Sequence, residues 1–234
     1  MKKVAIMQPY LFPYIGYWQL LNAADEFVIL DDVQYINRGW INRNRILVDG
    51  RDHLFTFSVV KAAQTQKINE RFFSADFQAE KTKFLKTLRY AYAKAPFFAQ
   101  GMELIARSLE FSAGNIAVNI GKNLAVIAEY LDISTKTSFA SGIDCNKELK
   151  AQDYILAIND KLGSDVYINP SGGVELYEKA AFAQHNIELC FLKSDPISYK
   201  QFRDSFVANL SIIDVIMFNS CVEIKEMLGR YELI

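Results

Sequence analysis

The sequence predicts an α/β fold built on a parallel, Rossmann-like sheet of the nucleotidyltransferase-like type, with a helical insertion. Apolar runs at 4–7 and 27–30 are separated by a proline- and glycine-rich turn and a short helical pattern. This order of strand, helix and strand is typical of parallel sheets. The same rhythm returns from residue 137 onward, whereas 76–131 is helical in pattern. We therefore expect a single α/β domain over 1–234 with a helical insertion at about 76–131.

The composition is that of a globular protein whose net charge is too small to produce a strong electrostatic field. Of 234 residues, 51% are hydrophobic and 23% are charged, and the net charge of −1 disfavours nucleic acid as a partner. Three widely spaced cysteines fit reduced thiols, and the apolar run after the N-terminal lysines is too short for a signal peptide. No later stretch has the length of a membrane span, so we expect a cytoplasmic protein.

Turn signals and periodicity place the elements of the N-terminal half. Asp49-Gly50 between apolar flanks predicts a hairpin of strands at 45–48 and 53–59. Apolar residues spaced four apart predict helices over 76–94 and around 116–131, the first of them stopped by a proline.

The C-terminal half returns to alternating strands and helices. Short apolar runs predict strands at 137–139, 165–168 and 187–192. Helices are expected at 151–162, where Gly163 is placed as a cap, and at 174–184. A capping box from Ser211 to Asp214 opens a last helical region that runs to about 228.

The turn that opens the first helix can be compared with the HxGH signature of nucleotidylyltransferases. Tyr14, Gly16 and Tyr17 stand where that signature has its two histidines and the glycine that lets a nucleotide approach the backbone. Tyrosine donates a hydrogen bond to a phosphate but carries no positive charge near neutral pH. The comparison favours ligand contacts by these three residues and disfavours retained nucleotidyl transfer.

Polar groups follow the first two strands, where an open parallel sheet receives its ligand. Gln8 follows the first strand, and Asp31 and Asp32 follow the second. As candidate catalytic residues, these aspartates can bind a metal, act as a general base or hold ligand hydroxyls. Adjacent residues on a strand point to opposite faces, so one of them is expected to face the pocket. In the structural alternative, one caps the following turn and the other pairs with Arg38 or Arg43.

Three arginines alternate with asparagines in the next segment. Arg38, Arg43 and Arg45 can clamp a phosphate or carboxylate with paired hydrogen bonds, and Asn42 is a further candidate contact. Because Arg43 and Arg45 are two residues apart, they share one face of an extended segment. The alternative is a solvated loop or strand edge.

A glycine-rich turn in the C-terminal half is a second candidate anion site. Ser171, Gly172 and Gly173 lie between an expected strand and an expected helix, where backbone N–H groups can hold an anion. Tyr177, one turn into that helix, can face the same cleft. The alternative is a turn that is merely tight.

Metal and cofactor signatures are missing from the sequence. His53 and His185 are the only histidines, and their separation does not match metal-ligand spacing. No Walker loop or nucleophile elbow accompanies them. We therefore predict no metal site, and the cofactor stays unknown.

The sequence resembles the WbqC-like protein family along essentially the whole chain. The stretches that carry the resemblance are 7–10 with 13–17, 24–28 with 31–34, 38–40 with 42–45, 92–97, 162–163 with Tyr167, 172–173 with Tyr177, and 210–214. The resemblance implies a role in bacterial O-antigen or other surface-polysaccharide biosynthesis. It supplies no agreed catalytic residues, and the segment 64–69 departs from its relatives.

These observations lead to two main hypotheses and a weaker third. In the first, the protein is a group transferase acting on an activated, nucleotide-linked sugar or amino sugar as a small-molecule substrate. Asp32 would be general base or hydroxyl ligand, Arg43 and Arg45 anion clamps, and Gln8 and Tyr17 substrate positioners. In the second, it is a non-catalytic nucleotide- or sugar-binding or scaffold protein derived from a nucleotidyltransferase-like fold. RNA binding through the arginines is the third, and the net charge disfavours it.

Overall fold

The centre of the molecule is a mostly parallel six-stranded sheet. The structure is a computed structural model that describes residues 1–111, 114–203 and 205–234. The strand order is β5-β2-β1-β6-β7-β8, and neighbouring strands run parallel except for β7 and β8. The strands are β1 (Lys3–Met7), β2 (Glu26–Ile29), β5 (Lys136–Phe139), β6 (Val166–Pro170), β7 (Glu188–Ser194) and β8 (Tyr231–Leu233).

Strand β1 marks the point where the order of strands reverses. The chain adds β2 and β5 on one side of β1, then returns to add β6 and β7 on the other side. Open parallel sheets receive ligands beyond the carboxyl ends of their strands at such a point. The loop after β1, at 8–14, and the segment after β6 are therefore well placed to form a site.

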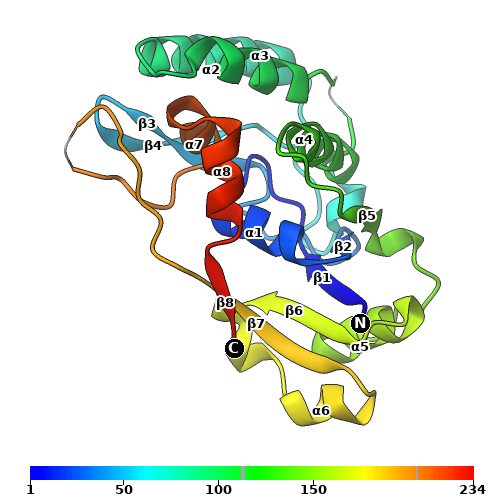
Figure 1. The fold of residues 1–234 in the computed structure, drawn as a ribbon. Helices are drawn as coiled ribbons and strands as arrows, with labels where there is room; N and C mark the ends of the chain where they lie inside the picture. The colour runs from blue at the N-terminus through cyan, green and yellow to red at the C-terminus, as the bar shows by residue number, and fades with distance from the viewer. Residues whose placement is uncertain (112–113, 204) are drawn as a thin grey trace.

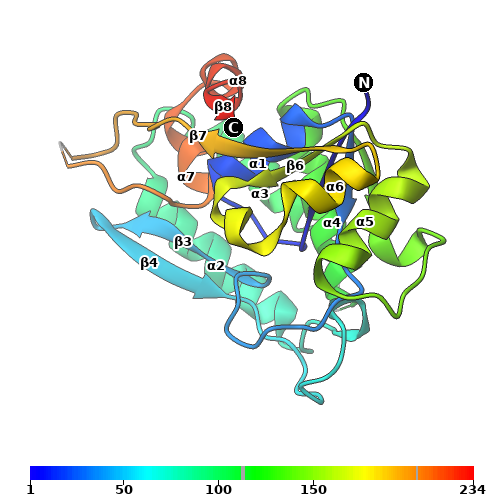
Figure 2. The ribbon, with the colours of Figure 1, turned by 90° about the horizontal axis from the view of Figure 1, so that it is seen from below.

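Alternating side chains give the two faces of the sheet separate cores. Val4 and Ile6 of β1 belong to one core, and Ala5 belongs to the other. The helices lie on both sides of the sheet (Figures 1 and 2). The first face is covered by α5 (Ala151–Leu162) and α6 (Lys179–Gln184), and the second by α1 (Ile15–Ala23), α4 (Ile116–Tyr130) and α8 (Cys221–Leu228). In the described part of the chain, no helix has the length and apolar character needed to cross a bilayer.

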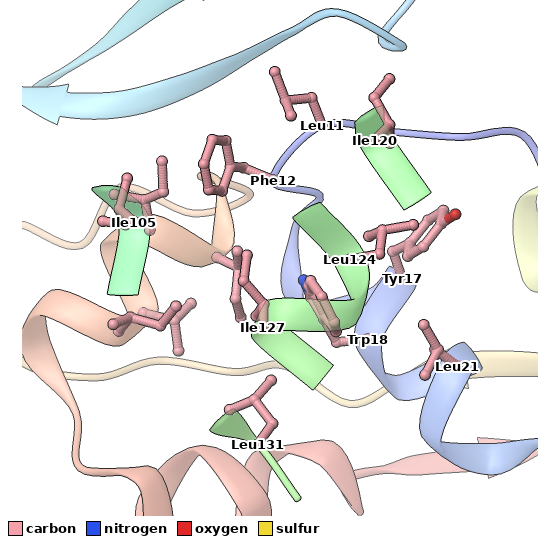
Figure 3. Close-up of a cluster of buried hydrophobic side chains, with 14 of the residues drawn as sticks. Leu11, Phe12, Tyr17, Trp18, Leu21, Ile105, Ile120, Leu124, Ile127 and Leu131 are labelled. Carbon is pink, nitrogen blue, oxygen red and sulfur yellow. The ribbon is translucent and has the colours of Figure 1, made fainter. Parts of the chain in front are cut away.

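Trp18 anchors the first helix to the larger core. Its side chain is fully buried, and its indole N–H donates to the carbonyl oxygen of Pro13 at 3.2 Å. Figure 3 shows it beside Leu124 and Ile127 of α4. Because a buried indole contributes large apolar area and needs a hydrogen-bond partner, this contact fixes both α1 and the turn that precedes it.

The predicted hairpin is confirmed as β3 (Arg43–Val48) and β4 (Arg51–Thr56). Asp49 and Gly50 have φ values of 52° and 78°, the positive values that a tight two-residue hairpin turn requires. The ring of Phe55 packs on that of Phe84 at 4.4 Å, which joins the hairpin to the helical layer. That layer contains α2 (Phe77–Tyr92), α3 (Phe98–Ser108) and α7 (Ile212–Phe218), and α2 and α4 confirm the predicted helices.

The expected helix over 174–184 is wrong in its first half. A 3-10 helix, η3 (Ser171–Leu176), follows β6 directly, and α6 begins only at Lys179. Tyr177 between them is extended, with φ −135° and ψ 141°, so it does not lie within a helix as expected.

The expected capping box at Ser211 is also wrong. The Ser211 hydroxyl does cap α7 by accepting from the Ile213 N–H at 3.2 Å. The carboxylate of Asp214, however, accepts hydrogen bonds from other side chains instead of returning to the helix end. The helical region then breaks at Asn219, and a capping box of Ser220 with Glu223 starts α8.

Candidate functional site

The loop between β1 and α1 builds a pocket with aromatic walls, here called the aromatic pocket. It encloses about 320 Å³, and the residues that define it are Gln8, Tyr10, Tyr14, Tyr17, Ile36 and Trp40. The Tyr17 hydroxyl donates to the carbonyl oxygen of Gln8 at 3.1 Å, and the Leu11 N–H donates to that of Ile41 at 2.9 Å. These two bonds hold the loop after β1 against α1 and against the segment 36–41.

The aromatic rings of the pocket are arranged for contact with a ring-shaped ligand. Tyr10 meets Tyr17 edge to face at 6.2 Å and lies tilted against Trp40 at 6.3 Å. Trp40 is 44% exposed, so much of its ring is open to a partner. Burial raises the pKa of Tyr10, Tyr14 and Tyr17 above the ordinary value, so these hydroxyls stay neutral near pH 7.

Arg43 and Arg45 share one face of β3, as their spacing predicts, and both lie against Trp40. The guanidinium carbons of Arg43 and Arg45 are each 5.4 Å from the centre of the Trp40 ring system. Asn44 points the other way and donates to the carbonyl oxygen of Phe12 at 2.6 Å. Both arginines therefore contact Trp40, which lines the aromatic pocket, but neither arginine lines the pocket itself.

The two arginines differ in what neutralises them. The guanidinium of Arg45 pairs with the Asp52 carboxylate at 3.4 Å, and both side chains are about half exposed. Arg43 is half-buried, its Nε has no hydrogen-bond partner, and no described carboxylate forms an ion pair with it. Because a desolvated guanidinium without a counter-charge is unfavourable, Arg43 is the better placed of the two to take an anion.

Gly16 is required by the packing of its neighbours. A side-chain carbon at this position would lie 2.5 Å from Cε2 of Tyr14 and 3.2 Å from Oγ of Ser194. Gly16 and Tyr14 also border a second cavity of about 480 Å³ between α1 and the segment after β7. The ring of Tyr14 thus lies between this cavity and the aromatic pocket, and a larger residue at position 16 would displace it.

The two predicted aspartates have different surroundings. Both carboxylate oxygens of Asp31 accept hydrogen bonds from Ser141. Asp32 accepts from the Tyr154 hydroxyl at 2.5 Å and pairs with the Lys147 ammonium at 3.1 Å, both through Oδ2. Its Oδ1 is buried and has no partner. Neither aspartate pairs with Arg38 or Arg43 among the described ion pairs, so this part of the structural alternative is wrong.

The groups around Asp32 form a cluster on the face of the sheet that α5 covers. Lys147 also donates to the Tyr154 hydroxyl at 2.9 Å, which ties the three side chains together. Burial and the hydrogen bond to Asp32 raise the pKa of Tyr154, so it stays a neutral donor. Tyr154 borders a small cavity of about 170 Å³ with Val33 and Tyr177. The sequence carries no signal for Lys147 or Tyr154, because more than a hundred residues separate them from Asp32.

The other predicted ligand contacts are spread over the molecule. Asn42 holds the loop in place, since it donates to the carbonyl oxygen of Phe57 at 2.6 Å and accepts from the Tyr35 hydroxyl at 2.9 Å. Arg38 is exposed and has a φ of 62°. Neither of them borders the aromatic pocket.

The glycine-rich turn lies apart from the aromatic pocket. Ser171 and Gly172 belong to η3, and Gly173 packs against the side-chain amide of Asn169 so closely that no side chain fits there. The Tyr177 ring packs on Phe182, on the face that α5 and α6 cover. Within the described ranges, no group of three or more histidine, cysteine, aspartate or glutamate residues is arranged to hold a metal ion.

Comparisons with known proteins give a family and one relative. The profile of the WbqC-like protein family matches residues 8–226. "Uncharacterized protein Rv1507c" of Mycobacterium tuberculosis is 30% identical over 234 residues, which cover 99% of each chain. No solved structure matches the chain.

Proposed function

The chain belongs to the WbqC-like protein family, and from this premise we propose that it is a transferase acting on a nucleotide-linked sugar or amino sugar. The observation that carries the proposal is the aromatic pocket, with Arg43 beside Trp40 and without an acidic partner among the described residues. Stacking rings and a cation without a counter-charge are what a ligand with a ring and a diphosphate requires.

The ligand's ring is expected on Trp40 and Tyr10. A base stacks through its π face, and a sugar packs its apolar C–H face on an aromatic ring. The phosphates then lie toward Arg43, whose planar group can form two parallel hydrogen bonds. Arg45 contributes less, because its charge is shared with Asp52.

The general base of the proposed transfer is Asp32. Its Oδ1 lacks a partner, whereas Lys147 and Tyr154 hold Oδ2 in place. A hydroxyl or amine of the acceptor attacks the transferred group, its proton passes to Oδ1, and the bond to the leaving group breaks with its electron pair. Asp31 has no such free oxygen. Strands β1 and β2 are neighbours, so the proposal requires a ligand that extends across their carboxyl ends from the aromatic pocket and reaches the buried Oδ1 of Asp32.

One observation favours the non-catalytic alternative. Tyr17, at the position of the second histidine in the HxGH comparison, is buried and uses its hydroxyl on the backbone of Gln8. It therefore neither carries charge nor offers a free donor to a phosphate. This supports loss of nucleotidyl transfer from a nucleotidyltransferase-like fold and is compatible with a protein that binds its ligand without reacting.

A ligand screen followed by one substitution distinguishes the transferase from the non-catalytic binding protein. Thermal shifts with nucleoside diphosphate sugars and amino sugars, alone and with acyl or aminoacyl donors, identify a ligand. Asp32→Asn is then compared with Asp153→Asn, an exposed aspartate of α5. The transferase predicts that Asp32→Asn still binds but loses turnover at least about a hundredfold, while the control keeps it. A wild type that binds and shows no turnover with any acceptor would favour the binding protein.

A further inference from the structure

Arg71 is a buried cation whose charge nothing in the described structure neutralises. It is 5% exposed and is the only basic residue among the buried ones that the structure describes. Its guanidinium lies over the Tyr35 ring at 4.7 Å. None of the described carboxylates forms an ion pair with it. Burial of a guanidinium without a counter-charge is costly, so the site as it stands is incomplete.

The hydrogen bonds of Arg71 use only part of its donor capacity. Nη2 donates to the carbonyl oxygen of Val60 at 2.9 Å, and Nη1 makes a longer contact of 3.4 Å with that of Ala63. The Nε is buried and has no partner. A guanidinium has five N–H donors, so each Nη keeps one donor that makes no hydrogen bond.

Arg71 lines a polar cavity of about 450 Å³, here called the Arg71 cavity. Its other polar walls are Asn37, Asn42, Thr56, Ser58 and Lys61. Lys61 is exposed at the rim and adds a second positive charge. Ser58 is held by Glu80, which accepts from its N–H at 2.8 Å and from its hydroxyl. The Glu80 carboxylate is thus engaged at the rim and is not paired with Arg71.

The Arg71 cavity is separate from the aromatic pocket. The segment 35–42 lies between them, with Ile36 and Trp40 bordering the aromatic pocket and Tyr35 and Asn37 bordering the Arg71 cavity. The two share no lining residue. A ligand in the Arg71 cavity therefore does not depend on the function proposed for the aromatic pocket.

We propose that the Arg71 cavity binds a small oxyanion, a phosphate or a carboxylate group, through the free donors of Arg71 with Lys61 at the rim. The planar guanidinium offers paired donors to either group, and the two share this chemistry. Asn37 and Thr56 are polar groups of the wall that can complete the coordination. The purely structural reading, in which Arg71 only holds the backbone at Val60 and Ala63, leaves its buried charge without a counter-charge.

Titration with simple anions tests the proposal. Inorganic phosphate and acetate are each titrated into the full chain at constant ionic strength, with binding followed by calorimetry. We expect saturable binding of one or both, which also identifies the preferred class. Lys61→Gln leaves the fold intact because its side chain is exposed, and it should weaken binding severalfold. Arg71→Lys keeps a charge without the planar fork and should weaken it roughly ten- to hundredfold.

A matched control locates the site. Lys86→Gln, which replaces an exposed lysine of α2, should leave anion binding unchanged. Saturable binding that falls in Lys61→Gln and Arg71→Lys and holds in Lys86→Gln supports the proposal. Absence of saturable binding for both anions overturns it. Binding that is unchanged in Lys61→Gln and Arg71→Lys overturns it as well.

Discussion

Asp32 and Asp214 are both buried carboxylates that accept hydrogen bonds from tyrosine hydroxyls. They differ in whether one carboxylate oxygen is left without a hydrogen bond. Oδ1 of Asp214 accepts a hydrogen bond from the Tyr92 hydroxyl at 2.8 Å. Its Oδ2 accepts from the Tyr199 hydroxyl at 2.7 Å and from the Gln201 amide at 2.8 Å. In Asp32, the hydrogen bond from Tyr154 and the ion pair with Lys147 both involve Oδ2, and Oδ1 has no hydrogen-bond partner. A carboxylate with both oxygens bonded holds a structure together, whereas one with a free oxygen at a strand end can still react.

The position of each carboxylate strengthens this contrast. The Asp214 network connects α7 with α2 and, through the Leu47 N–H that donates to the Tyr92 hydroxyl at 2.8 Å, with β3. Asp32 follows β2 at the carboxyl end of the sheet, where ligands bind. We therefore expect stability to depend on Asp214 and turnover to depend on Asp32.

The largest expected effect is on stability and belongs to Asp214. Asp214→Ala leaves buried donors of Tyr92, Tyr199 and Gln201 without an acceptor and should lower the free energy of unfolding by about 3 kcal/mol. Asp32→Ala leaves only the Tyr154 O–H without an acceptor, because Lys147 is partly exposed and still donates to Tyr154 and Ala140, so the loss should be smaller, about 1–2 kcal/mol. Urea unfolding of the two variants checks the difference. Equal losses would remove the distinction between them.

A smaller effect is expected for Tyr92→Phe. The hydroxyl both donates to Asp214 and accepts from the Leu47 N–H, so its removal leaves a buried backbone donor unpaired. The loss should be about 1–2 kcal/mol, also measured by urea unfolding. Tyr90→Phe on the exposed side of the same helix is the control and should change little. A Tyr92→Phe variant as stable as wild type would mean that the network is not structural.

The fold was more predictable from the sequence than the different surroundings of Asp32 and Asp214 were. The Asp49-Gly50 turn and the runs at β1 and β2 are local signals, and they predicted the hairpin and the parallel strands. Asp32 was also predictable, because it ends an apolar run. Its partners Lys147 and Tyr154, the Asp214 network and the antiparallel strand β8 depend on contacts far apart in the chain. The predicted capping box of Ser211 with Asp214 was wrong for the same reason. The Asp214 carboxylate accepts hydrogen bonds from Tyr92 and Tyr199, which are distant in the sequence, and not from the start of the helix.

A pH dependence of stability is expected from Asp214. Burial raises its pKa above the ordinary 3.8. Because the folded value is higher than the unfolded one, protonation favours the folded state. The gain is complete below about pH 3.8 and is lost as the pH rises through the raised value. Relative to Asp214→Asn, which does not titrate, wild type should gain stability as the pH falls through this window. A constant difference between the two across acidic pH would contradict the raised pKa.

The central claim is that Trp40 and Arg43 hold the ligand, and calorimetric titration of a nucleotide-linked sugar tests it most directly. Charge-assisted hydrogen bonds are worth roughly 1.5–3 kcal/mol, so Arg43→Lys should weaken binding about ten- to hundredfold. Arg45→Lys is the matched control on the same strand. It should change affinity by less than about threefold, because Arg45 is exposed and paired with Asp52. Binding by Arg43→Lys that is as tight as wild type would contradict the claim and move the ligand to another part of the molecule.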